Sequence, residues 1–195
     1  PFPTTDESMT GFLEPSISYS SDGFDLMVPY FKVLSGKSDI TIAARNISER
    51  GPGLEGNYRK LHGGLSNIDF LYFHSDKEYK ELYSDEKDKR WAFKYTDKYQ
   101  LNENVRVEVD WSKASDSLVL RDISGEITSI GSEREQYLNQ NISITGEFKN
   151  LILKIEQEKN QSLNPLLTNG YEKSPSVDLS FFKNIGNFLF RENLN

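Results

Sequence analysis

The residue types that most often carry out chemistry are scarce in this chain. Among its 195 residues there are two histidines and no cysteine, too few to complete a typical zinc site. His62 lies in a Gly-rich stretch, and His74 is followed directly by Ser75 and Asp76. A Ser-His-Asp triad needs its members to converge from separate places in the fold, whereas these three are adjacent in sequence. The sequence therefore predicts neither a hydrolytic triad nor a metal site.

Two further patterns match binding motifs by letter alone. Residues 51–56 read GPGLEG and fit G-x-G-x-x-G, but that motif binds a dinucleotide only between a buried strand and a helix N-terminus. Residues 57–61 have the pattern of a strand, so we interpret the match as coincidental. The acidic residues Asp85, Glu86 and Asp88 lack the spacing of an EF-hand and are expected to solvate a loop. The sequence thus predicts a protein that is not an enzyme and needs no cofactor.

Composition limits the possible partners and the structural class. The net charge is -7, which argues against a nucleic-acid partner because phosphate binding needs a basic face. Hydrophobic residues make up 36% of the chain, a value usual for soluble proteins, but the strands of a membrane barrel need an apolar residue only at every second position. No apolar run approaches the roughly 20 residues of a spanning helix. If the chain meets a membrane, we expect it to do so through strands.

Alternating hydrophobicity predicts an all-β fold of about eleven strands. The clearest strand covers residues 105–112 and has two opposite rows of side chains. The apolar row is Val105, Val107, Val109 and Trp111. The polar row is Arg106, Glu108, Asp110 and Ser112. In a soluble sandwich the apolar row would cover a core, whereas in a membrane barrel it would face lipid and the polar row a watery lumen. Periodicity alone leaves both interpretations open.

The lengths of the predicted connections favour the barrel. From the fifth predicted strand onward, long connections alternate with short ones. The long connections are 75–88, 113–134 and 157–174, and the short ones are 102–104, 149–150 and 183–186. Alternate connections of an antiparallel meander lie at opposite ends, so this pattern resembles the short periplasmic turns and long extracellular loops of outer-membrane proteins. We therefore predict an antiparallel up-and-down meander that forms a partial transmembrane β-barrel.

The first long connection contains a weak helical signal. The spacing of Tyr79, Leu82 and Tyr83 would suit a helical turn, but the surrounding charge favours a solvated loop. We predict a loop over residues 75–88.

Residues 10–31 predict a hairpin with a proline in each strand. The break Ser-Ser-Asp-Gly at residues 20–23 suits a tight turn between two alternating runs. Pro15 is early in the first strand and Pro29 late in the second, so antiparallel pairing brings both to the same end of the pair. Proline has no N–H to donate, which predicts a weak ladder there. The prolines either only mark strand ends or leave a seam that parts readily.

Several short motifs, taken in order, carry a resemblance to a known family. Residues 10–16 read TGFLEPS and residues 28–31 read VPYF. The later motifs are NYRKL at 57–61, KRW at 89–91, VDWSK at 109–113 and PSVDL at 175–179. Together they resemble the opening of the barrel domain of the LptD family (OstA/Imp) of outer-membrane lipopolysaccharide-assembly proteins. The resemblance covers nearly the whole chain.

This resemblance implies a domain organisation. Residues 1–9 would be a linker from an upstream periplasmic jelly-roll domain, and residues 10–195 the N-terminal portion of the outer-membrane barrel. The chain is thus expected to be a piece of a longer protein.

The resemblance also implies a function without covalent chemistry. The expected function is transport and insertion of lipopolysaccharide into the outer leaflet of the bacterial outer membrane, with Pro15 and Pro29 in a lateral gate. The implied partners are lipopolysaccharide, outer-membrane lipid, the lipoprotein plug LptE and the periplasmic bridge protein LptA. The alternative is a soluble periplasmic or secreted all-β binding module, in which the apolar row at 105–111 would pack against a second sheet.

Overall fold

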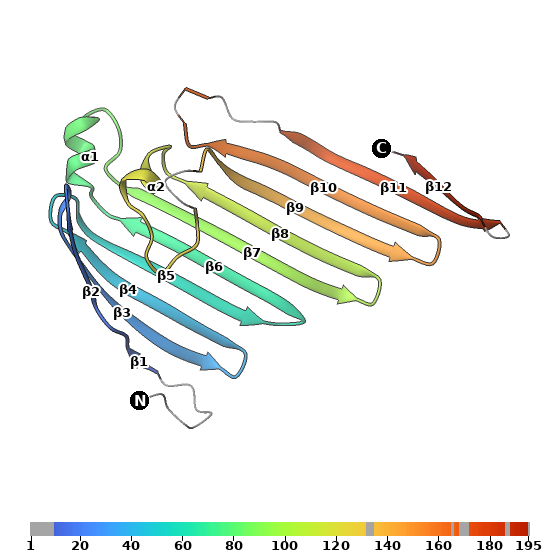
Figure 1. The fold of residues 1–195 in the computed structure, drawn as a ribbon, viewed down its shortest axis with the longest axis horizontal. Coiled ribbons are helices and arrows are strands. Elements are labelled where there is room, and N and C mark those ends of the chain that lie inside the picture. The colour runs from blue at the N-terminus through green and yellow to red at the C-terminus, as the bar shows by residue number, and fades with distance from the viewer. Residues whose placement is uncertain (1–9, 132–134, 165, 168–171, 186–187, 195) are drawn as a thin grey trace.

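The computed structural model describes residues 10–131, 135–164, 166–167, 172–185 and 188–194, so the predicted linker at residues 1–9 lies outside it. Twelve strands and two short helices occur in the described residues (Figure 1). The strands are β1 (Gly11–Phe12), β2 (Ser16–Ser20), β3 (Gly23–Ser35), β4 (Ser38–Ile47), β5 (Gly51–Leu61), β6 (Gly64–Phe73), β7 (Arg90–Asn102), β8 (Val105–Ala114), β9 (Tyr137–Phe148), β10 (Leu151–Ser162), β11 (Lys173–Ile185) and β12 (Phe188–Leu194). The helices are α1 (Lys77–Leu82) and α2 (Val119–Asp122).

All the described strands belong to one open antiparallel sheet. From β3 to β12 each strand pairs with the next one in sequence. β1 and β2 both pair with β3 and together form one interrupted edge strand, so the sheet has eleven strand positions across its width. The predicted all-β antiparallel meander of about eleven strands is confirmed. Among the described residues there is no second sheet.

The connections differ between the two ends of the sheet. Among the described residues, those at one end, which we call the turn end, are two-residue turns at 36–37, 62–63, 103–104 and 149–150. Those at the other end, the loop end, are 21–22, 48–50, 74–89, 115–136 and 163–172. The predicted alternation of long and short connections is therefore present in the described residues, except that residues 183–185 of the predicted turn 183–186 continue β11 and residue 186 lies outside the described residues. The third long connection is shorter than predicted because polar residues after Ile155 continue the ladder of β10, where the apolar alternation has already stopped.

Gly51, Pro52 and Gly53 lie in a strand and not in a turn. These residues open β5, and their partners on β4 are Ile47, Asn46 and Arg45. The actual turn comes earlier, at residues 48–50, and Gly51 follows it with a φ of 113°, a conformation that favours glycine. The G-x-G-x-x-G match thus lies within a strand.

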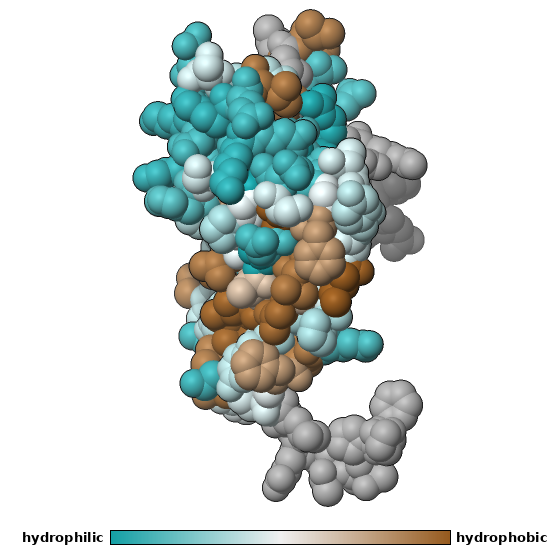
Figure 2. Space-filling view, turned by 90° about the vertical axis from the view of Figure 1, so that its left-hand side faces the viewer, coloured by the Kyte–Doolittle hydropathy of each residue, from teal (hydrophilic) through white to brown (hydrophobic). Residues whose placement is uncertain are grey.

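The register gives the sheet two chemically different faces. We call the face covered by the connection 115–136 the inner face, and the opposite one the outer face. Large hydrophobic side chains on the outer face are 37–49% exposed, namely Ile42, Leu54, Ile68, Ile142, Ile144, Ile155, Val177 and Phe181. Figure 2 shows hydrophobic side chains gathered in a band below a hydrophilic end. An apolar surface of this extent is typical of a face that contacts lipid or another protein.

A small hydrophobic core lies at the loop end of the inner face. Strand residues Leu71, Phe73, Ala92 and Ala114 belong to one buried cluster with residues of the connection 115–136. The members from that connection are Val119, Leu120, Ile123 and Ile130. The connection therefore folds back over the inner face of the sheet (Figure 1). Burial of these side chains fixes its position.

The loop predicted for residues 75–88 was wrong at α1. Asp76 caps this helix by accepting a hydrogen bond from Tyr79 N at 3.0 Å. The Tyr79 side chain is buried, and its ring lies 4.0 Å from the guanidinium carbon of Arg90. The cap and this long-range contact outweigh the charge that favoured a solvated loop. Within the described residues, neither α1 nor α2 is long and apolar enough to cross a membrane.

The two faces of β8 lead to a first prediction. In the full-length protein folded into lipid vesicles, Val107→Lys should cost about 2 kcal/mol of folding free energy, because it puts a charge on the apolar outer face. Urea unfolding in vesicles measures this loss. Glu108→Lys is the matched control, since Glu108 is the next residue and lies on the inner face. Equal losses from the two substitutions would contradict this assignment of the faces.

Candidate functional site

The edge of the sheet beside Pro15 and Pro29 is interrupted. β1 and β2 pair with β3 in registers that differ by one residue, so residues 13–15 lie opposite Val28 and Pro29 as in a β-bulge. Leu13 N donates to Pro29 O at 2.9 Å within this break. The two prolines were expected at one end of the hairpin. The interruption instead lies inside the edge, because β1 pairs with β3 again beyond it.

The backbone N–H that Pro29 lacks would point toward the edge strand and would pair it with β3. The backbone N and O of one strand residue point to the same neighbouring strand. Pro29 O accepts from Leu13 on the edge strand, so the missing N–H also faces that strand. On its other side Pro29 is paired with Ala43 in an unbroken part of the β3–β4 ladder. The weak point is therefore confined to the outermost strand.

The predicted rows of β8 lie on opposite faces of the sheet. The predicted lipid-facing residues Val105, Val107, Val109 and Trp111 lie on the outer face, opposite residues 140–146 of β9. The described residues provide no second sheet to cover them, which disfavours the sandwich core. Contact of this row with lipid stays a prediction.

The predicted lumen-facing row lies on the inner face. It consists of Arg106, Glu108 and Asp110. Arg106 Nε lies 3.2 Å from a Glu108 carboxylate oxygen in an exposed ion pair. Asp110 accepts a long hydrogen bond from Asn139 Nδ2 at 3.5 Å. Contact of this row with a lumen stays a prediction.

Buried arginines hold the connections of the loop end onto the sheet. Arg90, at the start of β7, has a fully buried side chain. It donates to Asp116 at 2.8 and 3.1 Å, and to Asp76 and Asp122 at 3.0 Å each. Asp76 caps α1, whereas Asp116 and Asp122 belong to the connection 115–136. One guanidinium therefore ties both long connections to the sheet.

Arg45 on β4 makes a second such attachment farther along the inner face. It donates two hydrogen bonds from Nε and Nη2 to Asp25 and another to the buried Glu55. Arg45 Nη1 also donates to Ser124 O at 2.7 Å. Glu55 in turn accepts from the backbone N of Glu126 at 3.0 Å and of Ile127 at 3.2 Å. The connection 115–136 is thus hydrogen-bonded to the inner face at β4 and β5.

Arg50, in the turn between β4 and β5, completes what we call the arginine network. The network consists of Arg45, Arg50 and Arg90 with the carboxylates of Asp22, Asp25, Glu55, Asp76, Glu78, Asp116 and Asp122. Arg50 donates to Asp22 at 2.9 Å and to Asp76 at 3.1 Å, and its Nη2 lies 2.9 Å from Glu78. Asp76 therefore joins Arg50 to Arg90. Burial of these charges is tolerable because each one has partners.

The arginine network also sets the protonation of Asp116. Burial acts to raise the pKa of Asp116, but the hydrogen bonds and positive charge of Arg90 outweigh it and hold that pKa below its usual range. Asp116 also accepts from Leu118 N at 2.9 Å, which shapes the approach to α2. The carboxylate of Asp116 is therefore charged at neutral pH.

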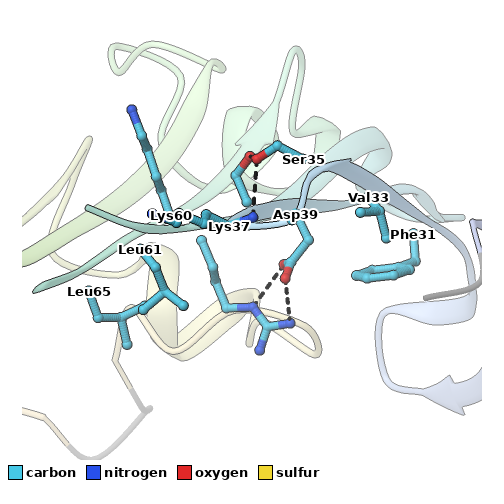
Figure 3. A pocket seen from close by; sticks show the side chains of 11 residues that line it. Phe31, Val33, Ser35, Lys37, Asp39, Lys60, Leu61 and Leu65 are labelled. Carbon is cyan, nitrogen blue, oxygen red and sulfur yellow. Dashed lines mark hydrogen bonds and ion pairs between the residues drawn. The ribbon is translucent and has the colours of Figure 1, made fainter. Parts of the chain in front are cut away.

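An amphipathic hollow of about 350 Å³ opens at the turn end of strands β3 to β6 (Figure 3). Asp39 accepts two hydrogen bonds from Arg59 at its centre, at 2.9 and 3.1 Å. Its apolar lining comes from Phe31, Val33, Leu61 and Leu65, and Lys37 adds a positive charge. Sequence reasoning missed this hollow because its residues come from separate strands. Apolar and cationic groups together suit an anionic amphiphile.

The other group that sequence reasoning missed is a polar cluster on the outer face. We call His62, Ser66, Tyr95 and Asp97 the His62 cluster. Ser66 Oγ donates to Asp97 at 3.1 Å, and Tyr95 donates to Asp97 at 2.8 Å. The same His62 nitrogen, Nε2, contacts both the Ser66 hydroxyl and the Asp97 carboxylate, whereas a catalytic triad uses the two ring nitrogens separately. The sequence did contain a signal, since Ser66 and Asp97 break the apolar alternation of their strands.

The structure also shows the surroundings of the residues that were considered for a metal site or a catalytic triad. Among the described residues, no three His, Cys, Asp or Glu side chains are grouped so that they could hold a metal ion. His74 accepts or donates one hydrogen bond with the Tyr72 hydroxyl at 3.1 Å and does not join Ser75 and Asp76 in a triad. Asp88 accepts from Ser75 Oγ at 2.8 Å and helps to close the connection 74–89.

Comparisons with known proteins find LPS-assembly proteins LptD among the relatives of this chain. The chain is 30% identical over 178 residues to the LPS-assembly protein LptD of Pseudomonas entomophila (strain L48), a match that covers 90% of this chain and 19% of that protein. Over 183 residues it is 28% identical to the LptD of Pseudomonas aeruginosa (strain LESB58), covering 93% and 19%. Over 146 residues it is 32% identical to the LptD of Pseudomonas putida (strain W619), covering 74% and 15%. No family model matches the chain.

These matches confirm the resemblance to LptD that the motifs predicted. The chain spans about a fifth of the length of the first of these relatives.

The arginine network leads to a second prediction. In the full-length membrane-embedded protein, Arg90→Gln should leave three carboxylates without their shared cation, and the connection 115–136 should lose about 3–5 kcal/mol of its attachment. Limited proteolysis should then cleave between residues 115 and 131 much faster than in the wild type. Arg121→Gln is the control, because the Arg121 side chain is 60% exposed and its ion pair with Asp122 is a surface contact. Equal protection in the Arg90 variant would contradict the role given to the network.

A third prediction concerns pH. Because the pKa of Asp116 is lower in the folded chain than in the unfolded one, its carboxylate stabilises the folded connection above about pH 4. That contribution disappears as the pH falls through the folded pKa. The hydrogen-exchange protection factors of residues 115–131, corrected for the intrinsic pH dependence of exchange, should therefore fall below about pH 4, and Asp116→Asn should flatten this dependence. An unchanged pH profile in the variant would assign the effect to other groups.

Proposed function

We propose that this chain is part of the wall of an LptD-like barrel and takes part in assembling lipopolysaccharide into the outer leaflet of the outer membrane. The observation that carries this proposal is one open sheet with an uncovered apolar outer face and a polar inner face. The similarity to LptD over 90% of the chain supports it. Because the chain covers 19% of that relative, closure of a barrel requires strands from elsewhere.

The connections suggest how this wall is oriented. Outer-membrane barrels have short turns on the periplasmic side and long loops outside. By that rule the turn end faces the periplasm and the loop end the exterior. Residues 10–195 would then be the N-terminal portion of the barrel, and residues 1–9 the linker from a periplasmic jelly-roll domain.

The two faces suit the two parts of a lipopolysaccharide molecule. Its sugars would pass along the polar inner face, and its acyl chains would leave sideways into the membrane. The hollow in Figure 3 supports this route, because it offers apolar and cationic groups at the periplasmic end of the inner face. No covalent step is needed, and the names of the relatives describe assembly rather than catalysis.

The lateral exit would lie at the first edge of the sheet. A closed barrel satisfies every backbone polar group and has no edges, so an exit requires a place where the closing hydrogen bonds are few. The bulge at residues 13–15 and the donor missing from Pro29 weaken the pairing between the edge strand and β3, so the edge strand itself would move aside more readily. Each missing hydrogen bond lowers the cost of opening by about 1 kcal/mol. Pro15 and Pro29 would thereby form part of the lateral gate.

The same proposal includes partners. Lipopolysaccharide and outer-membrane lipid would contact the chain directly, whereas the plug LptE and the bridge protein LptA would serve the complete protein. A soluble binding module is not favoured, because its apolar row needs a second sheet and the described residues form a single one.

The gate can be tested by restoring its hydrogen-bond donors. In the full-length protein, the double substitution Pro15→Thr and Pro29→Val should tighten the edge and depress delivery of lipopolysaccharide to the cell surface. Surface lipopolysaccharide can be measured by modification with an outer-leaflet enzyme. Pro52→Val is the control, since Pro52 lies in β5, away from the edge. Undiminished delivery in the double variant would count against the gate.

A further inference from the structure

The His62 cluster breaks an otherwise apolar outer face. Ser66 on β6 and Asp97 on β7 are opposite each other, and the next outer position in this row is Val109. A carboxylate on a lipid-contacting surface must be paired or must lie at the level of the headgroups. Asp97 meets the first condition through Ser66, Tyr95 and His62. These contacts hold the carboxylate in one position.

The cluster lies where the apolar band ends toward the turn end. One outer row across β5 to β7 contains Tyr58 and Tyr95. Lys60 lies opposite Ser66 in the neighbouring row, which is closer to the turn end. Tyrosine and lysine are the side chains that mark a membrane–water boundary. A hollow of about 460 Å³ opens at this boundary, and it is lined by Tyr58, Lys60, His62, Ser66, Ile68 and Tyr95. It is therefore placed at the depth of lipid headgroups.

We propose that this hollow binds a membrane lipid with a phosphoethanolamine headgroup, in the leaflet at the turn end. The inference rests on the membrane location given under the proposed function. Lys60 is exposed and has no ion-pair partner in the described part of the chain, so its ammonium is available to the lipid phosphate. A Lys60 contact alone would accept any phosphate-bearing lipid.

Asp97 supplies selectivity for the ammonium group. Its side chain is 15% exposed, and Oδ2 accepts one hydrogen bond, from Tyr95. A carboxylate oxygen can accept two, so one position is left for the lipid ammonium. Asp97 adjoins the hollow without lining it, and is hydrogen-bonded to Ser66 and Tyr95, which do line it. Lys60 and Asp97 lie on either side of Ser66, and this pair of opposite charges favours a zwitterionic headgroup over phosphoglycerol, which has no cation to pair with the carboxylate.

The outer face also provides a surface for the acyl chains. From the hollow toward the loop end, the next outer side chains along β6 are the apolar Ile68 and Phe70. The Phe70 ring lies over Gly56, where a Cβ would come within 2.2 Å of it, so this part of the wall is smooth. A soluble phosphoethanolamine compound would lack this contact. The site is thus expected to bind the lipid and not its free headgroup.

The experiment uses the full-length protein in nanodiscs made of equal parts phosphatidylethanolamine and phosphatidylglycerol with the same acyl chains. After mild detergent extraction, native mass spectrometry counts the retained lipids. The wild type should retain phosphatidylethanolamine preferentially, and Lys60→Gln and Asp97→Asn should each bring the retained ratio toward that of the bulk. Lys32→Gln is the control, because Lys32 is also exposed on the outer face but lies two strands from Lys60, on β3.

Each outcome decides the matter. Wild-type protein that enters the nanodiscs without preference, or Lys60 and Asp97 variants that keep it, would overturn this inference alone. Displacement of the retained lipid by soluble phosphoethanolamine at equal concentration would show that the acyl chains contribute nothing, and would overturn it too. Protein that does not enter the nanodiscs at all would contradict the membrane location, and the inference would fail with it.

Discussion

Everything in this structure depends on the antiparallel register, which puts alternate residues on opposite faces of a single sheet. A slip of one residue between two strands would exchange their faces and move carboxylates among the apolar side chains. The described connections at the turn end are two-residue turns, and the register shifts beside them, after Val33 and after Gln100, are followed by regular pairing along the rest of each strand pair. Because those turns are short, the apolar rows of successive strands stay aligned across the sheet. The continuous apolar outer face follows from this alignment.

The sequence was sufficient for features that depend on near neighbours. Period-two alternation identified the strands, and the lengths of the connections identified a meander, because both signals are local. Sequence reasoning did not find the end of β10, because this strand continues to Ser162 through polar residues that pair with β9. It failed again at α1, where burial of Tyr79 depends on Arg90, a residue outside the predicted loop.

The functional groups were harder to predict for the same reason. Arg45 meets Ser124 across 79 positions of sequence, and Glu55 meets Ile127 across 72, so no local pattern joins them. The connection 115–136 was predicted only as a long loop over residues 113–134, yet its apolar residues are buried on the inner face. The His62 cluster needed residues from β6, β7 and a turn. The sequence indicated these sites only indirectly, as charged or polar residues where the alternation predicts apolar ones.

The arginine network and the interrupted edge beside Pro15 and Pro29 are best considered together. A wall that opens at one edge must resist deformation elsewhere, since bending could otherwise absorb the displacement of the edge strand. Buried ion pairs resist separation strongly, because a carboxylate that loses its partner in the interior costs several kcal/mol. Arg50 bridges Asp22, which adjoins the edge hairpin, to Asp76 and so to Arg90. The loop end of the hairpin is thereby held fixed, while the bulge at residues 13–15 weakens the same strands farther toward the turn end. If the edge opens as proposed, it would do so as a hinge with its fixed point at the arginine network.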